Sequence, residues 1–396
     1  MPAKSPLDMM SSPEAARRAA APPRRRLVPI LAPAAIIVVL GLAWFGLWSY
    51  GASIAERTLD GWVAREAAAG RYYSCGSQST GGFPARIEVR CSDVAAEVRT
   101  LQPPYVLKAQ SLAFAAEIWH PTELAGNVTG PLAFTLADRP PLLIANWTRA
   151  TLTLRGIPPD PDKVAVQLDN AYVETGGTHD TIVRAKSGDL QGSVVEGSAH
   201  DHPVIAITLR LDGASAPTFH PLFAEPLAAD FDATIRGLSD LSPKPWADRF
   251  REIHAANGGI EVKSLRMTQG KIVVAGTGSL NINGRGRLEG LLRVSIVGID
   301  DLVPRLGIDR LISQSIDQLA GSEGATARGA AALDRLIPGL GGAIRDSANS
   351  AVIENLKKMG QRSTIDNQPA IVLPLRVTDG AIYLGMLGVG EIPPLF

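Results

Sequence analysis

His200 and His202 have the spacing that comes closest to a metal site in this chain. On a strand the two side chains would share one face, and imidazole nitrogen is a common zinc ligand. No third ligand stands nearby in the sequence, and Pro203 indicates a turn. A solvated loop therefore explains the two histidines better than a metal site does.

Two further motifs suggest chemistry, the acidic pair Asp300-Asp301 and the glycine motif Gly276-Thr277-Gly278. Paired carboxylates serve acid–base catalysis, but acids also favour the first turn of a helix, and here we expect the helix. The glycines begin like a dinucleotide-binding fingerprint. However, Asn281 stands where the third glycine belongs, and the context is that of a strand.

Other signatures of catalysis are missing from the sequence, which has no Walker motif, no HExxH and no Gly-x-Ser-x-Gly elbow. The 39 Lys and Arg residues balance 39 Asp and Glu, so no basic field attracts nucleic acid. We therefore expect a non-enzymatic protein with no catalytic residue, no metal ligand, no cofactor and no nucleic-acid partner.

The chain has two cysteines, Cys75 and Cys91. Between them lie the turn signal Gly81–Pro84 and the alternating segment Arg86–Arg90, which together predict a hairpin. In an oxidising compartment we expect a disulfide joining the two arms, and closing a loop of about 15 residues stabilises by ~3 kcal/mol. Two unpaired core cysteines are the alternative. A redox or metal site is not expected, because there is no CxxC and no third ligand.

The run Leu27–Tyr50 has no charged side chain and is long enough to cross a hydrocarbon core of ~30 Å as a helix. Five arginines precede it, whereas the first charges after it, Glu56 and Arg57, cancel. The positive-inside rule then leaves the N-terminus in the cytoplasm and the bulk of the chain outside. A cleaved signal peptide is the alternative, with Ser53-Ile54-Ala55 as its cleavage site, but signal h-regions usually have only about 7–15 residues.

This anchor divides the chain into regions of different pattern. We expect a disordered cytoplasmic tail (1–26), a membrane anchor (27–50), a juxtamembrane helix (51–70), a first β-rich region (71–240) and a second β-rich region (241–396). The fold class is therefore α+β, a transmembrane helix followed by a mostly antiparallel, strand-rich region with a few amphipathic helices.

Period-two alternation separated by Pro- and Gly-rich turns supports the antiparallel sheet of the first region. The predicted strands include Ala109–Trp119, Leu132–Leu136, Leu142–Leu154, Val164–Val173 and Ile205–Leu211. Prolines at 217, 221 and 226 mark a loop, and the apolar spacing over Lys244–Ala256 predicts a short helix. Tryptophans 119, 147 and 246 are expected to fill the core rather than line a ligand groove.

In the second region, Gly259–Gly298 predicts a meander of short strands with glycines at nearly every turn. The chain closes with a predicted hairpin, whose turn lies at Asp379-Gly380. Two amphipathic helices are expected between them, Leu306–Leu319 and Ala343–Met359.

Four features together resemble one protein family. They are the anchor, the segment Gly82–Cys91 (GFPARIEVRC), the glycine-punctuated block at 276–290, and the ending that starts Leu-Pro-Leu-Arg-Val-Thr-Asp-Gly at 373 and closes on Pro-Pro-Leu-Phe. In these the chain resembles the DUF2125 family, envelope proteins of alphaproteobacteria with no assigned activity. The block at 259–298 is also similar to the last β region of AsmA-like envelope proteins, which implies a role in lipid traffic or outer-membrane assembly.

We expect an inner-membrane-anchored periplasmic protein that binds lipid or another apolar ligand in envelope biogenesis. The ligand would lie between the sheet and the two helices. The candidate face consists of Ile308, Leu311, Ile312, Ile316 and Leu319. Packing of this face on the sheet is the alternative, and the mixed charge on the polar sides of the helices favours it. A scaffold without a ligand, partnered by another envelope protein, and a hydrolase with a nonlocal site are the alternatives.

Overall fold

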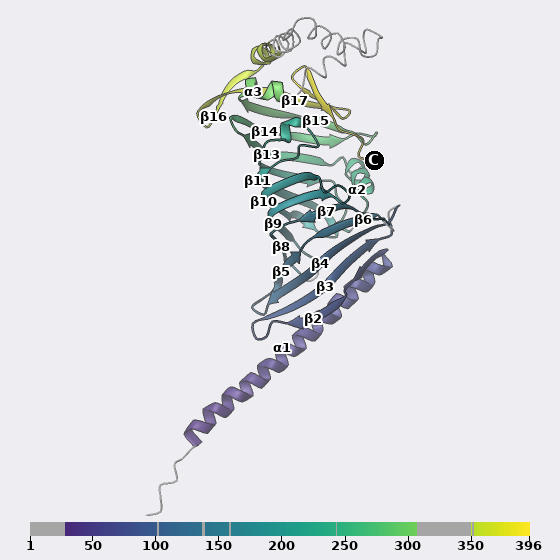
Figure 1. Ribbon diagram of the computed structural model, residues 1–396, viewed down its shortest axis with the longest axis vertical. Coiled ribbons are helices and arrows are strands. Elements are labelled where there is room, and N and C mark those ends of the chain that lie inside the picture. Colours follow the sequence, from purple (N-terminus) through teal and green to yellow (C-terminus); the bar gives the residue numbers. More distant parts are fainter. Residues whose placement is uncertain are drawn as a thin grey trace, which may run out of the picture. The chain divides into compact units, whose positions relative to one another are not determined.

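A computed structural model describes residues 28–100, 103–136, 139–157, 160–242, 244–306, 350 and 352–396 (Figure 1). The chain divides into two compact units after Tyr50. Helix α1 (Val28–Ala68) begins in the first unit and ends in the second. Within the described residues, one helix is long and apolar enough to cross a membrane, Ala35–Ala68.

The juxtamembrane part of α1 is helical, as predicted. It ends before Gly70, whose N–H donates to the carbonyl of Ala67 and whose φ of +79° belongs to the left-handed region that glycine tolerates. Trp62 packs against Tyr73 with 4.7 Å between ring centroids, and the Arg71 guanidinium donates to Glu66 Oε1 at 3.0 Å. These contacts attach the last turns of α1 to the first strands of the sheet.

Nineteen strands within the described residues form one sheet, and every pairing is antiparallel. The bounds of the strands before the loop at 215–226 are β1 (Arg71–Ser74), β2 (Ser77–Gly81), β3 (Arg86–Val98), β4 (Tyr105–Glu117), β5 (His120–Thr129), β6 (Leu132–Leu136), β7 (Pro141–Asn146), β8 (Arg149–Arg155), β9 (Lys163–Thr175), β10 (Thr181–Ser198) and β11 (Asp201–Ala214). After it come η1 (Pro221–Phe223), β12 (Leu227–Arg236), α2 (Trp246–Ala255), β13 (Gly259–Gln269), β14 (Ile272–Ile282), β15 (Leu288–Val297), α3 (Ile299–Arg305), β16 (Gln361–Ile365), β17 (Gln368–Thr378), β18 (Ala381–Leu384) and β19 (Leu387–Glu391).

The strands follow one another as a long ladder, which Figure 1 shows from β2 and β3 to β17. The paired order is β3, β4, β5, β8, β9, β10, β11, β12, β13, β14, β15 and β17. β6 and β7 also connect β4 to β9, beside β5 and β8. They do so because β6 pairs with the first half of β4 and β7 pairs with the last residues of β9, all antiparallel. This arrangement confirms the predicted fold class, strand-rich and mostly antiparallel with an apolar N-terminal helix.

One predicted strand is wrong in its extent. Leu142–Leu154 is not one strand but two, β7 and β8, separated at Trp147-Thr148. The break lies opposite Asn170, which has a φ of 49° within β9. The two short strands therefore pair with different halves of β9.

The glycine prediction for the second region also needs correction. The meander is present as β13, β14 and β15, but Gly276 and Gly278 lie inside β14 and Gly290 lies inside β15, not at turns. A Cβ at Gly278 would overlap the carbonyl oxygen of Leu291 in β15, so these glycines allow close approach of neighbouring strands.

Three other local predictions are confirmed. The hairpin between the cysteines is β2 and β3, the C-terminal hairpin is β17 and β18, and the helix predicted over Lys244–Ala256 is α2. The predicted helix Leu306–Leu319 lies outside the described residues beyond Leu306, and the one at Ala343–Met359 is described, as helix, only at 350 and 352–359. The predicted division after residue 240 falls between β12 and α2, within the second compact unit, and stays a prediction.

Candidate functional site: an apolar face of the ladder

A continuous row of apolar residues crosses the ladder from β3 to β17. Each member is the direct cross-strand partner of the next, and only two glycines interrupt the apolar side chains. The row consists of Val89, Phe114, Gly126, Leu152, Val166, Leu190, Leu209, Phe231, Leu265, Gly276, Val294 and Leu373. Since neighbouring strands lie ~4.8 Å apart, this apolar row extends roughly 50 Å.

The next residue along most of these strands is polar and points to the opposite face, as strand alternation requires. In the middle of the ladder the neighbouring row reads Thr151, Gln167, Asp189, Arg210, Asp230 and Arg266. The sheet therefore has one apolar face and one polar face. This division was not predicted, because it depends on the register between strands far apart in sequence.

Burial of the apolar row changes sharply along the ladder. Leu190 in β10 is 44% exposed, whereas Val294 in β15 is 3% exposed and Leu373 in β17 is completely buried. Within the described part of the chain, the main buried cluster includes members of the row only from Phe231 onward.

The cover over the buried part comes from short helical segments. Leu222 of η1, Ile299, Leu302 and Val303 of α3, and Leu356 of the helix at 352–359 pack onto the apolar face of β13 to β17. Ile253 of α2 and the C-terminal Phe396 pack beside them, against Ile235 and Ile282. The same apolar face is thus a core at one end and a partly open surface over β8 to β11.

The polar face is held together by hydrogen bonds and ion pairs between neighbouring strands. Asp189 accepts from the amide groups of Gln167 and Gln191, both at 2.9 Å, and the bond from Gln167 contributes most to lowering the pKa of this carboxyl. The Thr208 hydroxyl, at 2.7 Å, lowers the pKa of Asp232 in the same way. These acids have hydrogen-bond partners on neighbouring strands, so their role on the polar face is to stabilise the sheet.

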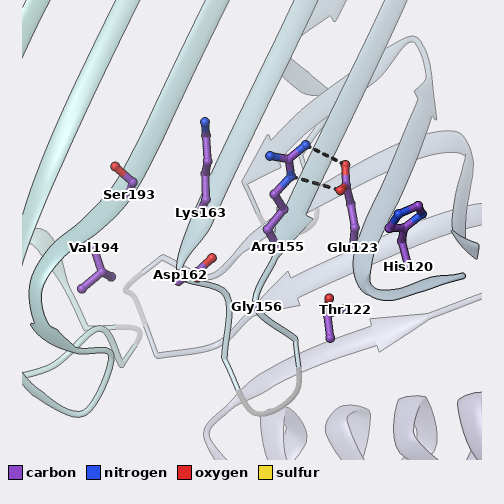
Figure 2. A pocket seen from close by; sticks show the side chains of 9 residues that line it. All are labelled: His120, Thr122, Glu123, Arg155, Gly156, Asp162, Lys163, Ser193 and Val194. Atoms are coloured by element: carbon purple, nitrogen blue, oxygen red, sulfur yellow. Dashed lines mark hydrogen bonds and ion pairs between the residues drawn. The ribbon is translucent and has the colours of Figure 1, made fainter.

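A hollow of about 540 Å³ lies on this polar face, near the ends of β8 and β9. Figure 2 shows the side chains of Ser193, Lys163, Arg155 and Glu123 on the same side of the strands, with Arg155 bonded to Glu123. A second hollow, of about 670 Å³, is lined by the polar row and its neighbours. Charged side chains line both hollows, among them Arg155 and Lys163 in the first and Asp189 and Arg210 in the second.

The residues singled out for metal chemistry do not converge. His200 lies in a turn and contacts Asp160 at 2.7 Å, whereas His202 contacts Asp201 at 2.9 Å. No group of three potential metal ligands occurs among the described residues. The acidic pair at Asp300-Asp301 occupies the first turn of α3, as expected, and Asp300 also pairs with Lys357 at 2.6 Å.

Other candidate residues are distributed as follows. Cys75 and Cys91 form a disulfide with 5.6 Å between Cα atoms, next to the β2–β3 pairing. Ile308, Leu311, Ile312, Ile316 and Leu319 lie outside the described residues. The prediction that the tryptophans fill the core is wrong for Trp119 and Trp246, which are exposed because they lie at a hairpin tip and at the start of α2. Trp147 is partly buried and donates from Nε1 to the carbonyl of Val128 at 2.8 Å.

Comparison with known proteins places the chain in a family. Residues 48–393 match the family described as "Uncharacterized protein conserved in bacteria (DUF2125)". The chain is a member of the DUF2125 family. The match covers β1 to β19, so the ladder with its apolar row is the matched part of the chain. No curated protein and no solved structure matches this DUF2125 chain.

Proposed function

We propose that this DUF2125 protein is a non-enzymatic, membrane-anchored envelope protein that binds lipid acyl chains on the apolar face of its ladder. The observation that carries the proposal is the open stretch of the apolar row, where Leu190 stays exposed while the same row is buried at the other end. Its neighbours in the row, Val166 and Leu209, are only partly buried. Apolar side chains left open to solvent beside one another are typical of a binding surface.

An acyl chain binds through burial of its methylene groups, and the apolar row provides a surface for that burial. Each methylene removed from water contributes ~0.8 kcal/mol, so half a dozen methylenes on the row contribute about 5 kcal/mol. Binding of this kind needs apolar walls and few polar groups. The resemblance of the block at 259–298 to the last β region of AsmA-like proteins agrees with the same class of ligand.

The proposed location is the inner membrane, with the N-terminus in the cytoplasm and residues from Gly51 onward in the periplasm. The arginines before the anchor and the disulfide in the first β region support this topology. Alkaline phosphatase fused after Phe396 is then expected to be active. An inactive, stably expressed fusion would contradict the topology.

Lipid co-purification tests the ligand. The full chain is extracted in mild detergent and its bound lipid is quantified by mass spectrometry. We expect wild type to retain lipid and Leu190→Asp to lose most of it, because the carboxylate would lie on the apolar row. Ser193→Asp, on the same strand but on the polar face, is the matched control and should retain lipid. Folded, lipid-free wild type would favour a scaffold without ligand.

A further inference from the structure

The tips of two neighbouring hairpins carry exposed aromatic side chains. Phe83, in the turn between β2 and β3, is 48% exposed, and Trp119, in the turn between β4 and β5, is 64% exposed. β3 and β4 pair along their length, and the N–H of Ile118 donates to the carbonyl of Ala85 at 3.1 Å. The two tips are therefore adjacent.

The tips lie near the residue with which the second compact unit begins, Gly51. Tyr50 is the last residue of the uncharged run, and a Cβ placed on the next residue, Gly51, would lie 3.0 Å from Cδ1 of Ile87, near the start of β3. Further along α1, Trp62 contacts Tyr73, which pairs with Ala96 near the other end of β3. From Gly51 onward, α1 thus runs from the tip end of β3 toward the other end of that strand.

The chemistry of the tips matches a lipid headgroup region. Aromatic rings are enriched at both interfaces of a bilayer, where one part of the ring meets lipid and another meets water. Arg86, beside the first tip, pairs with Glu88 at 2.8 Å and its side chain is half-exposed.

We propose that the tips at Phe83 and Trp119 lie in the headgroup region of the membrane that holds α1. The apolar row then begins next to the lipid surface, since Val89 lies in β3 shortly after the first tip. This inference rests on the proposed membrane anchor and adds the surface by which the second compact unit contacts the bilayer.

Site-specific labelling of the full chain tests the inference. Single cysteines are introduced as Phe83→Cys and Trp119→Cys and labelled with the fluorophore NBD, while the native disulfide stays oxidised. Phe219→Cys and Trp246→Cys are matched controls, because these aromatics are 71% and 76% exposed but belong to the loop before η1 and to α2. Leu42→Cys, inside the uncharged run, reports on the anchor itself.

The labelled proteins are reconstituted in vesicles of phosphatidylethanolamine and phosphatidylglycerol that contain a nitroxide lipid labelled close to the headgroup. We expect the nitroxide to quench labels 83 and 119 severalfold more than labels 219 and 246, with iodide in the water showing the opposite order. If label 42 is quenched by lipid while 83 and 119 behave like 246, the tip inference is overturned and the anchor stands. If label 42 is open to iodide, the anchor fails, and the inference fails with it.

Discussion

Leu190 and Leu373 belong to the same apolar row, and replacing each by alanine distinguishes an open face from a covered core. Leu373 is fully buried, so Leu373→Ala removes packed methyl groups and leaves a cavity, which typically costs about 2–5 kcal/mol. Leu190 is 44% exposed, so Leu190→Ala loses only about half of the ~1.5–3 kcal/mol that full burial of a leucine contributes, and it leaves no closed cavity. We therefore expect a loss of about 1 kcal/mol for Leu190→Ala.

Urea unfolding of the delipidated full chain in detergent, followed by circular dichroism, measures both losses. Leu373→Ala should move the midpoint to clearly lower urea, and Leu190→Ala should move it slightly. Delipidation matters because bound lipid would stabilise the wild type and enlarge the effect at Leu190. Equal losses at the two positions would mean that the row over β10 is covered, and the reasoning from its exposure would be refuted.

Three further predictions concern the sheet and its supports. Gly278→Ala should lower the free energy of unfolding by about 1–3 kcal/mol, because the new Cβ would overlap backbone atoms of the next strand. Gly192→Ala, on the same face but with open space around it, should be neutral or stabilising. Equal effects at the two positions would contradict the close packing at Gly278. Cys75→Ser should remove ~3 kcal/mol and lower the melting temperature by several degrees, an effect that reduction of the wild type should reproduce. Burial raises the pKa of Glu252, but hydrogen bonds from Ser239 and Lys244 and the positive charge of Arg249 together outweigh it and lower the pKa from 4.5 to about 2. Because a lowered pKa stabilises the fold only while the carboxyl is ionised, the stability difference between wild type and Glu252→Gln should be largest above pH 5 and shrink as the pH falls toward 2; a difference independent of pH would contradict it.

Local patterns in the sequence predicted the local structures. The uncharged run predicted the apolar helix, and the turn signals predicted the β2–β3 hairpin with its disulfide and the β17–β18 hairpin. Each of these depends on residues close together in the chain. The apolar spacing predicted α2 for the same reason, with Ile253 on its buried face.

Long-range features escaped prediction. The sequence pattern does not predict strand β10, because Gly188 and Gly192 occupy positions on the apolar face where alternation would require large side chains. The apolar row itself exists only through the registers of many strands, and no local pattern encodes them. The surface that supports the functional proposal therefore becomes visible only in the folded structure. It lies on β8 to β11, whereas the sequence pattern points to the helix predicted over Leu306–Leu319.

Photo-crosslinking at alternate positions of two paired strands tests lipid binding on the apolar face most directly. Benzoylphenylalanine is placed at Leu190 or Leu209 on the apolar row, and at Asp189 or Arg210 on the polar face as controls. After irradiation of membranes containing the full chain, mass spectrometry counts lipid adducts at each position. The proposal predicts adducts at 190 and 209 and almost none at 189 and 210. Equal yields on the two faces, or no adducts on a folded protein, would contradict it.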